Sequence, residues 1–231
     1  MSREDPGAAW MRHMRRGEWE TAWRLSDAGL SGPLDWTLPR HLQRVWTGEP
    51  VEGRRVLVRC YHGLGDTLQF IRFVPMLRRV AAEVTVWAQP ALIPLLRTMP
   101  EMGRPLPLHD GTPACEHDVD LEIMELPHLF RVTPATLPAA VPYLHPQGRT
   151  LPGKAFKVGV VWAAGDWDPR RSMPPALLAP LARIPGVELH LLQRGAALGQ
   201  WPTATGRISG SDDVMDAASL MTALDLIISV D

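Results

Sequence analysis

Apolar positions in the middle of the chain alternate between two spacings, one typical of strands and one typical of helices. Short β-branched runs indicate buried strands at 56–58, 84–87 and 119–124. Between them, helical spacing predicts a helix over 68–80, kinked at Pro75, and a shorter helix over 91–97. This succession of strand and helix predicts a parallel sheet with right-handed crossovers.

The same pattern begins again after a segment rich in proline and glycine, 126–153, and we place a domain linker within 143–156. Beyond the linker, strands are predicted at 157–162, 187–192 and 226–230. Helices are predicted over 175–183, which proline opens, and over 213–224, which has acidic residues in its first turn. The sequence therefore predicts an α/β chain with two parallel-sheet units, the second of them incomplete.

Residues 1–50 show only helical spacing. One helix is predicted around positions 8–14 and another from Trp19, with Gly17 as the break between them. A third, short helix is predicted over 39–47. A helix pair around a glycine turn has the form of one helical repeat, but a stable array needs about three. A helical cap packed on the next domain explains the pattern equally well.

Composition argues against a nucleic-acid-binding, membrane-spanning or disulfide-rich protein. The chain has 231 residues and a net charge of −1, so it lacks the basic field that nucleic acids or anionic membranes require. No apolar run reaches the ~18–20 residues of a membrane span, and the first residues do not resemble a secretory signal. Two cysteines, Cys60 and Cys115, do not make a disulfide framework. We expect a cytoplasmic protein with reduced thiols.

The turn at 62–67 follows a predicted strand and opens a helix, as phosphate-binding loops do. A dinucleotide fingerprint would need glycine at position 68, where this chain has Leu68, so a nicotinamide or flavin site is disfavoured. Asp66 is suited to cap the helix. That role is compatible with catalysis, because a capping aspartate at this edge of a sheet faces the cleft.

Two further loops carry polar residues. The loop at 162–172 has small residues that allow close backbone approach and two arginines suited to phosphate, although a solvated loop accounts for it equally well. The histidines and acids within 109–120 match no metal-ligand spacing, and we interpret them as a solvated loop. No metal and no cofactor is predicted.

Seven short stretches, in order along the chain, resemble glycosyltransferase family 9, the heptosyltransferase-like proteins. The most specific is 63–75, and the others are 126–127, 142–144, 158–163, 171–172, 192–193 and 224–231. The chain is most similar to the bacterial subgroup that carries tetratricopeptide repeats before the transferase, because 17–23 resembles the end of such a repeat region. The resemblance covers most of 15–231.

The resemblance implies a GT-B fold of two Rossmann-like domains. Residues 51–150 would take the acceptor, 151–231 would take a nucleotide-sugar donor, and 1–50 would be a tetratricopeptide-like remnant or cap. The implied reaction transfers a sugar from the nucleotide sugar to a hydroxyl of a glycan or protein acceptor, with Asp66 as general base. Arginine and helix-terminal amides, rather than a metal, would stabilise the leaving nucleoside diphosphate.

The resemblance also implies which residues line each side of the site. On the donor side they are Trp162, Gly165, Arg171, Ser172, Gln193 and Asp231. On the acceptor side they are His62, Gly63, Gly65, Thr67 and Gln69. The family usually has Glu-Gln before the Gly-x-Gly-Asp loop, whereas this chain has Tyr61-His62, which leaves the acceptor open.

The family continues beyond Asp231 with a helix that holds the donor's phosphates. We therefore interpret the chain as truncated and expect little or no transfer activity from it alone. The alternative function is a non-enzymatic binding or scaffold protein that uses the tryptophan-rich helical segment and the first sheet unit to hold a protein or glycan partner. A nucleotide-dependent oxidoreductase is a third hypothesis, disfavoured by Leu68.

Overall fold

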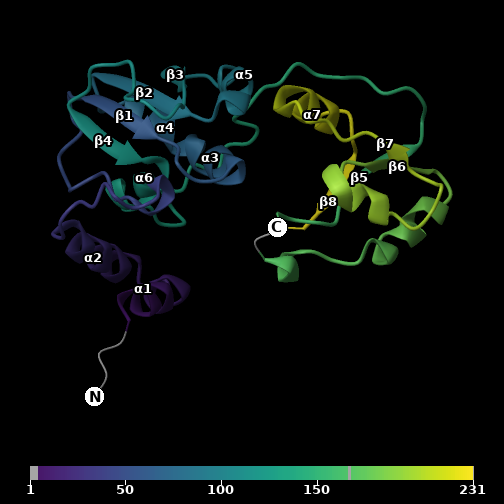
Figure 1. Cartoon of the computed structure of the whole chain (residues 1–231), viewed down its shortest axis with the longest axis horizontal. Coiled ribbons are helices and arrows are strands. Elements are labelled where there is room, and N and C mark those ends of the chain that lie inside the picture. Colours follow the sequence, from purple (N-terminus) through teal and green to yellow (C-terminus); the bar gives the residue numbers. More distant parts are fainter. Residues whose placement is uncertain (1–4, 166–167, 231) are drawn as a thin grey trace. The chain divides into compact units, whose positions relative to one another are not determined.

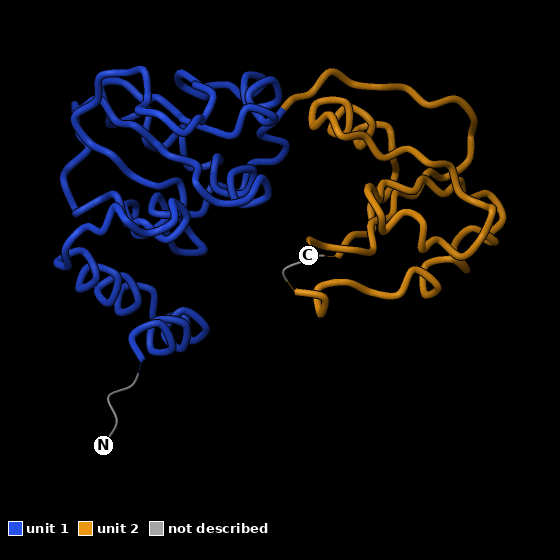
Figure 2. The backbone as a smooth tube through the Cα atoms, viewed as in Figure 1, with its two compact units in different colours: residues 1–144 blue, residues 145–231 orange. Residues whose placement is uncertain are grey.

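The computed structural model describes residues 5–165 and 168–230. The chain divides into two compact units, residues 1–144 and 145–231 (Figure 2). Each unit contains its own four-stranded parallel sheet. The division falls inside the segment rich in proline and glycine. The α/β class with two parallel sheets, which the hydrophobic pattern predicts, is confirmed.

The sheet of unit 1 has the strand order β3-β2-β1-β4. Its strands are β1 (Arg55–Arg59), β2 (Glu83–Ala88), β3 (Arg104–Pro107) and β4 (Val119–Glu122). The central strand β1 pairs with β2 on one side and with β4 on the other, so that Val56 lies opposite both Val84 and Val119. The sequence pattern does not show β3, because its two prolines lower its strand propensity. An edge strand tolerates proline, since only one of its sides joins the ladder.

Short helices lie between these strands and after the last of them. They are α3 (Leu64–Phe70), η2 (Ile71–Phe73), α4 (Val74–Arg78), η3 (Pro90–Leu92), α5 (Ile93–Leu96), η4 (Ile123–Glu125) and α6 (Leu126–Leu129). The prediction of one helix over 68–80 with a kink at Pro75 is wrong. The break is the 3-10 turn η2, and Pro75 lies in the first turn of α4, where its missing N–H removes no helical bond.

Before the sheet come α1 (Pro6–Arg15) and α2 (Trp19–Leu30), which form a pair (Figure 1). Gly17 joins them at a φ of +73°, a conformation that favours glycine. The predicted helix over 39–47 is wrong. Only the 3-10 turn η1 (Arg40–Leu42) forms, and the chain becomes extended at Gln43, which directs Trp46 into the core of unit 1.

The sheet of unit 2 has the strand order β7-β6-β5-β8. Its strands are β5 (Phe156–Val161), β6 (Val187–Leu191), β7 (Arg207–Ile208) and β8 (Leu226–Ser229). Its helical segments are η5 (Pro169–Arg171), η6 (Pro175–Leu177), η7 (Ala179–Arg183), η8 (Gly195–Gln200) and α7 (Val214–Met221).

The predicted helix over 175–183 is two 3-10 segments instead, because Pro180 lacks the amide that an α-helix would need there. The predicted helix over 213–224 is the shorter α7, with Asp213 as its N-cap. Within the described residues, no helix has both the length and the apolar character needed to cross a membrane.

Candidate functional site

The strand order of unit 1 places a switch point between β1 and β4. From β1 the chain proceeds to β2 and β3 on one side, and it then returns to form β4 on the other. In open parallel sheets, the crevice at the carboxyl ends of the strands beside such a switch is the usual ligand site. The turn after β1, which carries the predicted residues at 62–67, therefore lies at this crevice.

α3 starts at Leu64, within the 62–67 segment, and Gly63 is its N-cap. The prediction that Asp66 caps the helix is wrong, because Asp66 is the third helical residue and bonds back to the amide of the capping residue. Its Oδ2 accepts a hydrogen bond from the backbone amide of Gly63 at 3.0 Å. No donor among the described residues reaches its Oδ1, and the side chain is half-buried. Gly63 and Gly65 are both exposed, and a side chain at position 65 would meet only open space. Asp66 therefore presents one carboxylate oxygen beside an uncovered stretch of backbone.

Glu122, the last residue of β4, fixes the turn from the neighbouring strand. Its side chain is 4% exposed. Oε1 accepts from the backbone amide of Tyr61 at 3.2 Å and lies 3.0 Å from Nδ1 of His62. Oε2 accepts from the amide of Met124 at 2.7 Å. Nδ1 of His62 thus faces the Glu122 carboxylate, and Nε2 of the same ring points away from it.

Gln89, just after β2, holds the same turn from the other side. Its Nε2 donates to the carbonyl of His62 at 2.7 Å, and its Oε1 accepts from the hydroxyl of Thr67 at 3.0 Å. Thr67 is fully buried, so its side chain supports the turn and does not face a ligand. Burial also raises the pKa of the neighbouring Cys60 thiol, which stays uncharged.

Glu125 lies behind Glu122, and its Oε2 accepts from the backbone amide of Glu122 at 2.6 Å. Burial, together with the nearby Glu122 carboxylate, raises the pKa of Glu125 to about 8. At neutral pH this group therefore carries a proton, and it lies beside the Glu122 carboxylate, which in turn holds the turn that bears Asp66.

Arginines and aromatic rings flank the site at the ends of β1 and β2. The guanidinium of Arg59 makes two bonds to Asp120, of 2.7 and 2.8 Å, and lies 5.6 Å from the ring of Trp87. Nε2 of His117 lies 3.1 Å from the same carboxylate. Our interpretation of 109–120 as a solvated loop is wrong for His117 and Asp120, which lie in this partly buried network. It suits Asp110, whose side chain is exposed.

In unit 2 the corresponding switch lies between β5 and β8, and the loop after β5 is the predicted donor loop. Gln193, after β6, accepts with its Oε1 from the amides of Trp162 (3.1 Å) and Ala163 (2.9 Å). Ser172 accepts from the amide of Ala164 at 3.0 Å. The structure thus brings Gln193 and Ser172 to this loop, where both occupy its backbone amides.

The remaining predicted donor residues lie in different surroundings. The side chain of Trp162 is fully buried in the core of unit 2, 5.2 Å from the ring of Trp201, so it packs and does not line a surface. Gly165 and Ser172 line a small cavity of about 330 Å³. Arg171 is half-buried in η5. Asp231 lies outside the described residues.

No cluster of three or more His, Cys, Asp or Glu side chains in the described part of the chain is arranged to hold a metal ion. Comparison with known proteins yields no matching family model, no matching curated protein and no matching solved structure.

Sequence reasoning misses three residues that build the site, namely Gln89, Glu122 and Glu125. Each lies just beyond or at the end of a strand, on the same edge of the sheet as the turn after β1. Glu122 is buried at the end of β4, and an acid in a predicted buried strand is the signal that could have found it.

Proposed function

We propose that the chain is a sugar-transferase unit of the heptosyltransferase-like type, with a GT-B arrangement of its two sheets. Unit 1 takes the acceptor and unit 2 takes a nucleotide sugar. The observation that carries the proposal is the position of Asp66, whose carboxylate has a free oxygen at the switch point of the first sheet. The ordered likeness of seven stretches to that family supports it further.

In the proposed reaction, Asp66 accepts the proton of an acceptor hydroxyl while that oxygen attacks the anomeric carbon of the donor. The bond between the anomeric carbon and the nucleoside diphosphate breaks at the same time, and the diphosphate leaves with the bonding electrons. The hydrogen bond from the Gly63 amide keeps the carboxylate oriented, and Glu122 and Gln89 hold the turn in place. Asp66 thus needs little rearrangement to act.

On the donor side, Arg171 and the hydroxyl of Ser172 are the groups proposed to meet the diphosphate. The amides of Trp162, Ala163 and Ala164 already donate within the loop. Ser172 accepts from Ala164 through its oxygen and still has its own proton to donate. The reaction proposed here uses no metal, since the Arg171 guanidinium supplies the countercharge and the Ser172 hydroxyl supplies a hydrogen bond.

The test is a single-turnover assay with the chain in excess over a radiolabelled nucleotide sugar. Candidate nucleotide sugars are screened with a chelator present, and release of nucleoside diphosphate is measured. Asp66→Asn keeps the shape of the side chain but removes the base, so the rate should fall roughly a hundredfold. Asp110→Asn, which changes an exposed carboxylate of the same unit, is the matched control.

Equal rates for wild type and Asp66→Asn would contradict the proposal, and so would an absolute need for a divalent ion.

The second candidate function is a binding protein that uses the helical segment and unit 1. The observation that favours it is the docking of α2, where Trp23 donates to the carbonyl of Val132 at 3.0 Å. Under that function, Asp66→Asn leaves the affinity of the chain for its partner unchanged.

A further inference from the structure

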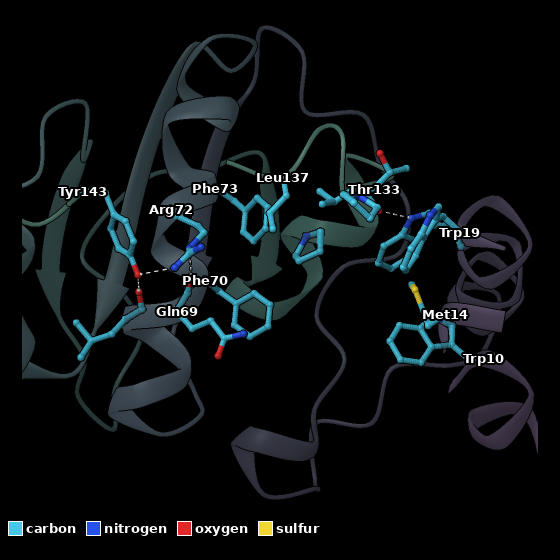
Figure 3. A pocket seen from close by; sticks show the side chains of 15 residues that line it. Trp10, Met14, Trp19, Gln69, Phe70, Arg72, Phe73, Thr133, Leu137 and Tyr143 are labelled. Carbon is cyan, nitrogen blue, oxygen red and sulfur yellow. Dashed lines mark hydrogen bonds between the residues drawn. The ribbon is translucent and has the colours of Figure 1, made fainter. Parts of the chain in front are cut away.

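Unit 1 contains a cavity of about 730 Å³ between the helix pair and α3. Figure 3 shows Trp10, Met14 and Trp19 on one side of it and Phe70 and Arg72 on the other. The volume lies within the range of roughly 300–1,000 Å³ that is typical of small-molecule sites. The cavity is therefore large enough for a ligand of moderate size.

The wall formed by the helix pair is fixed to the rest of unit 1. Trp23, in α2, donates to the carbonyl of Val132 at 3.0 Å, and its ring stacks on His128 with the centroids 5.8 Å apart. Asp27 binds both His128, at 2.8 Å, and Arg131, at 2.5 Å. Contacts that join two elements in this way hold the cavity open without a ligand.

The lining is mostly apolar. Eleven of the fifteen lining side chains are hydrocarbon, aromatic, thioether or proline groups, and four are polar: Gln69, Arg72, Thr133 and Tyr143. A sugar carries a hydroxyl on almost every carbon and would leave most of them without partners here, which is costly. The body of a fitting ligand is consequently apolar, and flat rings suit the indoles of Trp10 and Trp19.

Arg72 supplies the one formal charge in the lining. Its Nε donates to the carbonyl of Gln69 at 3.0 Å, its Nη2 donates to the hydroxyl of Tyr143 at 3.1 Å, and its guanidinium lies 4.7 Å from the Tyr143 ring. Tyr143 in turn donates to the carbonyl of Leu68 at 2.8 Å. No carboxylate among the described residues pairs with Arg72, and the lining contains no acid. A held, half-buried guanidinium without a countercharge is suited to bind an anion.

We propose that this cavity binds a small apolar anion, with a carboxylate, sulfonate or phosphate group at Arg72 and an aromatic or branched hydrocarbon body against Trp10, Trp19 and Phe70. The inference rests on the second candidate function, a binding role of the helical segment and unit 1, and on no step of sugar transfer. Its test is equilibrium binding, so its failure is distinct from a failure of the transferase proposal.

Two fluorescent probes with the same ring system test the proposal on the full chain. Anilinonaphthalene sulfonate carries the anionic group, and phenylnaphthylamine lacks it. We expect one site for the sulfonate, with quenching of tryptophan emission and an affinity roughly tenfold above that of the neutral probe. Arg72→Gln should weaken binding of the sulfonate roughly tenfold and leave the neutral probe unchanged.

Arg72→Lys separates a charge role from a packing role, because lysine keeps the cation and loses the two donor bonds. The proposal expects this variant to bind the sulfonate less tightly than wild type but more tightly than Arg72→Gln does, because the cation is kept and the guanidinium geometry is lost. Arg79→Gln, at an exposed arginine outside the lining, is the control and should change nothing. Equal affinity of wild type for both probes, no binding of either, or unchanged sulfonate binding in Arg72→Gln would each overturn the proposal.

Discussion

Glu125, a buried carboxyl beside the candidate site, makes the stability of the chain depend on pH. Its proton is held because burial and the Glu122 carboxylate oppose its ionisation, which puts its pKa at about 8. In the unfolded chain a glutamate has a pKa of about 4.3. Between these values the folded state binds one more proton than the unfolded state, and stability must fall as pH rises.

We expect the free energy of unfolding to fall by roughly 2–3 kcal/mol between about pH 6 and pH 9 through this group. The stabilisation is complete below about pH 4 and is lost as the pH rises through about 8. Glu125→Gln should remove this part of the pH dependence, even if the variant is less stable at every pH. Urea unfolding at both pH values measures the effect.

Glu52→Gln, at an exposed glutamate of the same unit, provides the comparison and should keep the wild-type pH dependence. An identical fall in stability for wild type and Glu125→Gln would show that Glu125 ionises normally.

Sequence reasoning at the scale of residues succeeds where the signal is local. Asp66 and its glycine turn are neighbours in sequence, so their position at the start of a helix follows from the pattern. The supports of that turn are not local. Gln89 reaches it from another strand, and Glu122 is 61 residues away from Tyr61, to whose amide it binds. Such long-range contacts depend on strand order, which periodicity does not contain.

At the scale of elements, α2 owes its position to a few side chains. Trp23 is 7% exposed and makes its bond to Val132 from inside the core, beside His128. Asp27 extends the junction, since bonds from Arg131 and His128 outweigh the effect of burial and keep its pKa below the ordinary value. The helix pair is therefore packed onto unit 1 and is not an independent arm.

Trp23→Phe should destabilise the chain by roughly 1–3 kcal/mol, because it leaves the carbonyl of Val132 without its donor and removes part of a large ring. Amide exchange in α1 and α2 should rise more than exchange in β1. Trp36→Phe is the matched control, since Trp36 is 52% exposed and should tolerate the change. Unchanged exchange in the helix pair of Trp23→Phe would mean that other contacts dock it.

Two of the helices that the pattern predicts wrongly share a cause. Proline occurs inside 68–80 and 175–183, and the apolar spacing alone treats each stretch as one helix. In the structure the 3-10 turn η2 divides the first stretch, and the second stretch forms the two 3-10 segments η6 and η7 in place of an α-helix. The strand β3 is missed for the same reason, since its prolines hide a segment that the edge of the sheet accepts.

At the scale of the whole molecule, each unit has its own sheet and core, and two glycines test this. A Cβ at Gly103, where φ is +83°, would lie 2.6 Å from the carbonyl oxygen of Val84 in unit 1. A Cβ at Gly159 would lie 2.7 Å from both Leu192 and Leu224 in unit 2. Gly103 therefore requires glycine, because the backbone blocks a side chain, whereas a side chain at Gly159 would force the two leucines to move.

Gly103→Ala and Gly159→Ala should each cost roughly 1–3 kcal/mol through crowding. Hydrogen exchange followed by mass spectrometry should place the loss in β1–β4 for the first variant and in β5–β8 for the second. Gly29→Ala in α2 is the control, because a Cβ there meets nothing within 4 Å, and it should stabilise the helix by roughly 0.5–1 kcal/mol. Exchange that rises equally in both units would show a single cooperative core.

The division into two parallel-sheet units is visible in the sequence because the hydrophobic period restarts after a proline-rich segment. The cavity between the helix pair and α3 is not visible, since its two walls come from elements about 50 residues apart. The transferase proposal rests on the likeness of short stretches and on the place of Asp66. A measured transfer rate is the observation that decides it.

The central claim is that Asp66 takes the proton of the acceptor. The most direct measurement is the single-turnover transfer rate of Asp66→Asn relative to wild type, at donor and acceptor occupancies matched by equilibrium binding. The account predicts unchanged dissociation constants and a rate at or below about one hundredth of wild type. A rate equal to that of wild type, or a loss explained wholly by weaker binding, would contradict it.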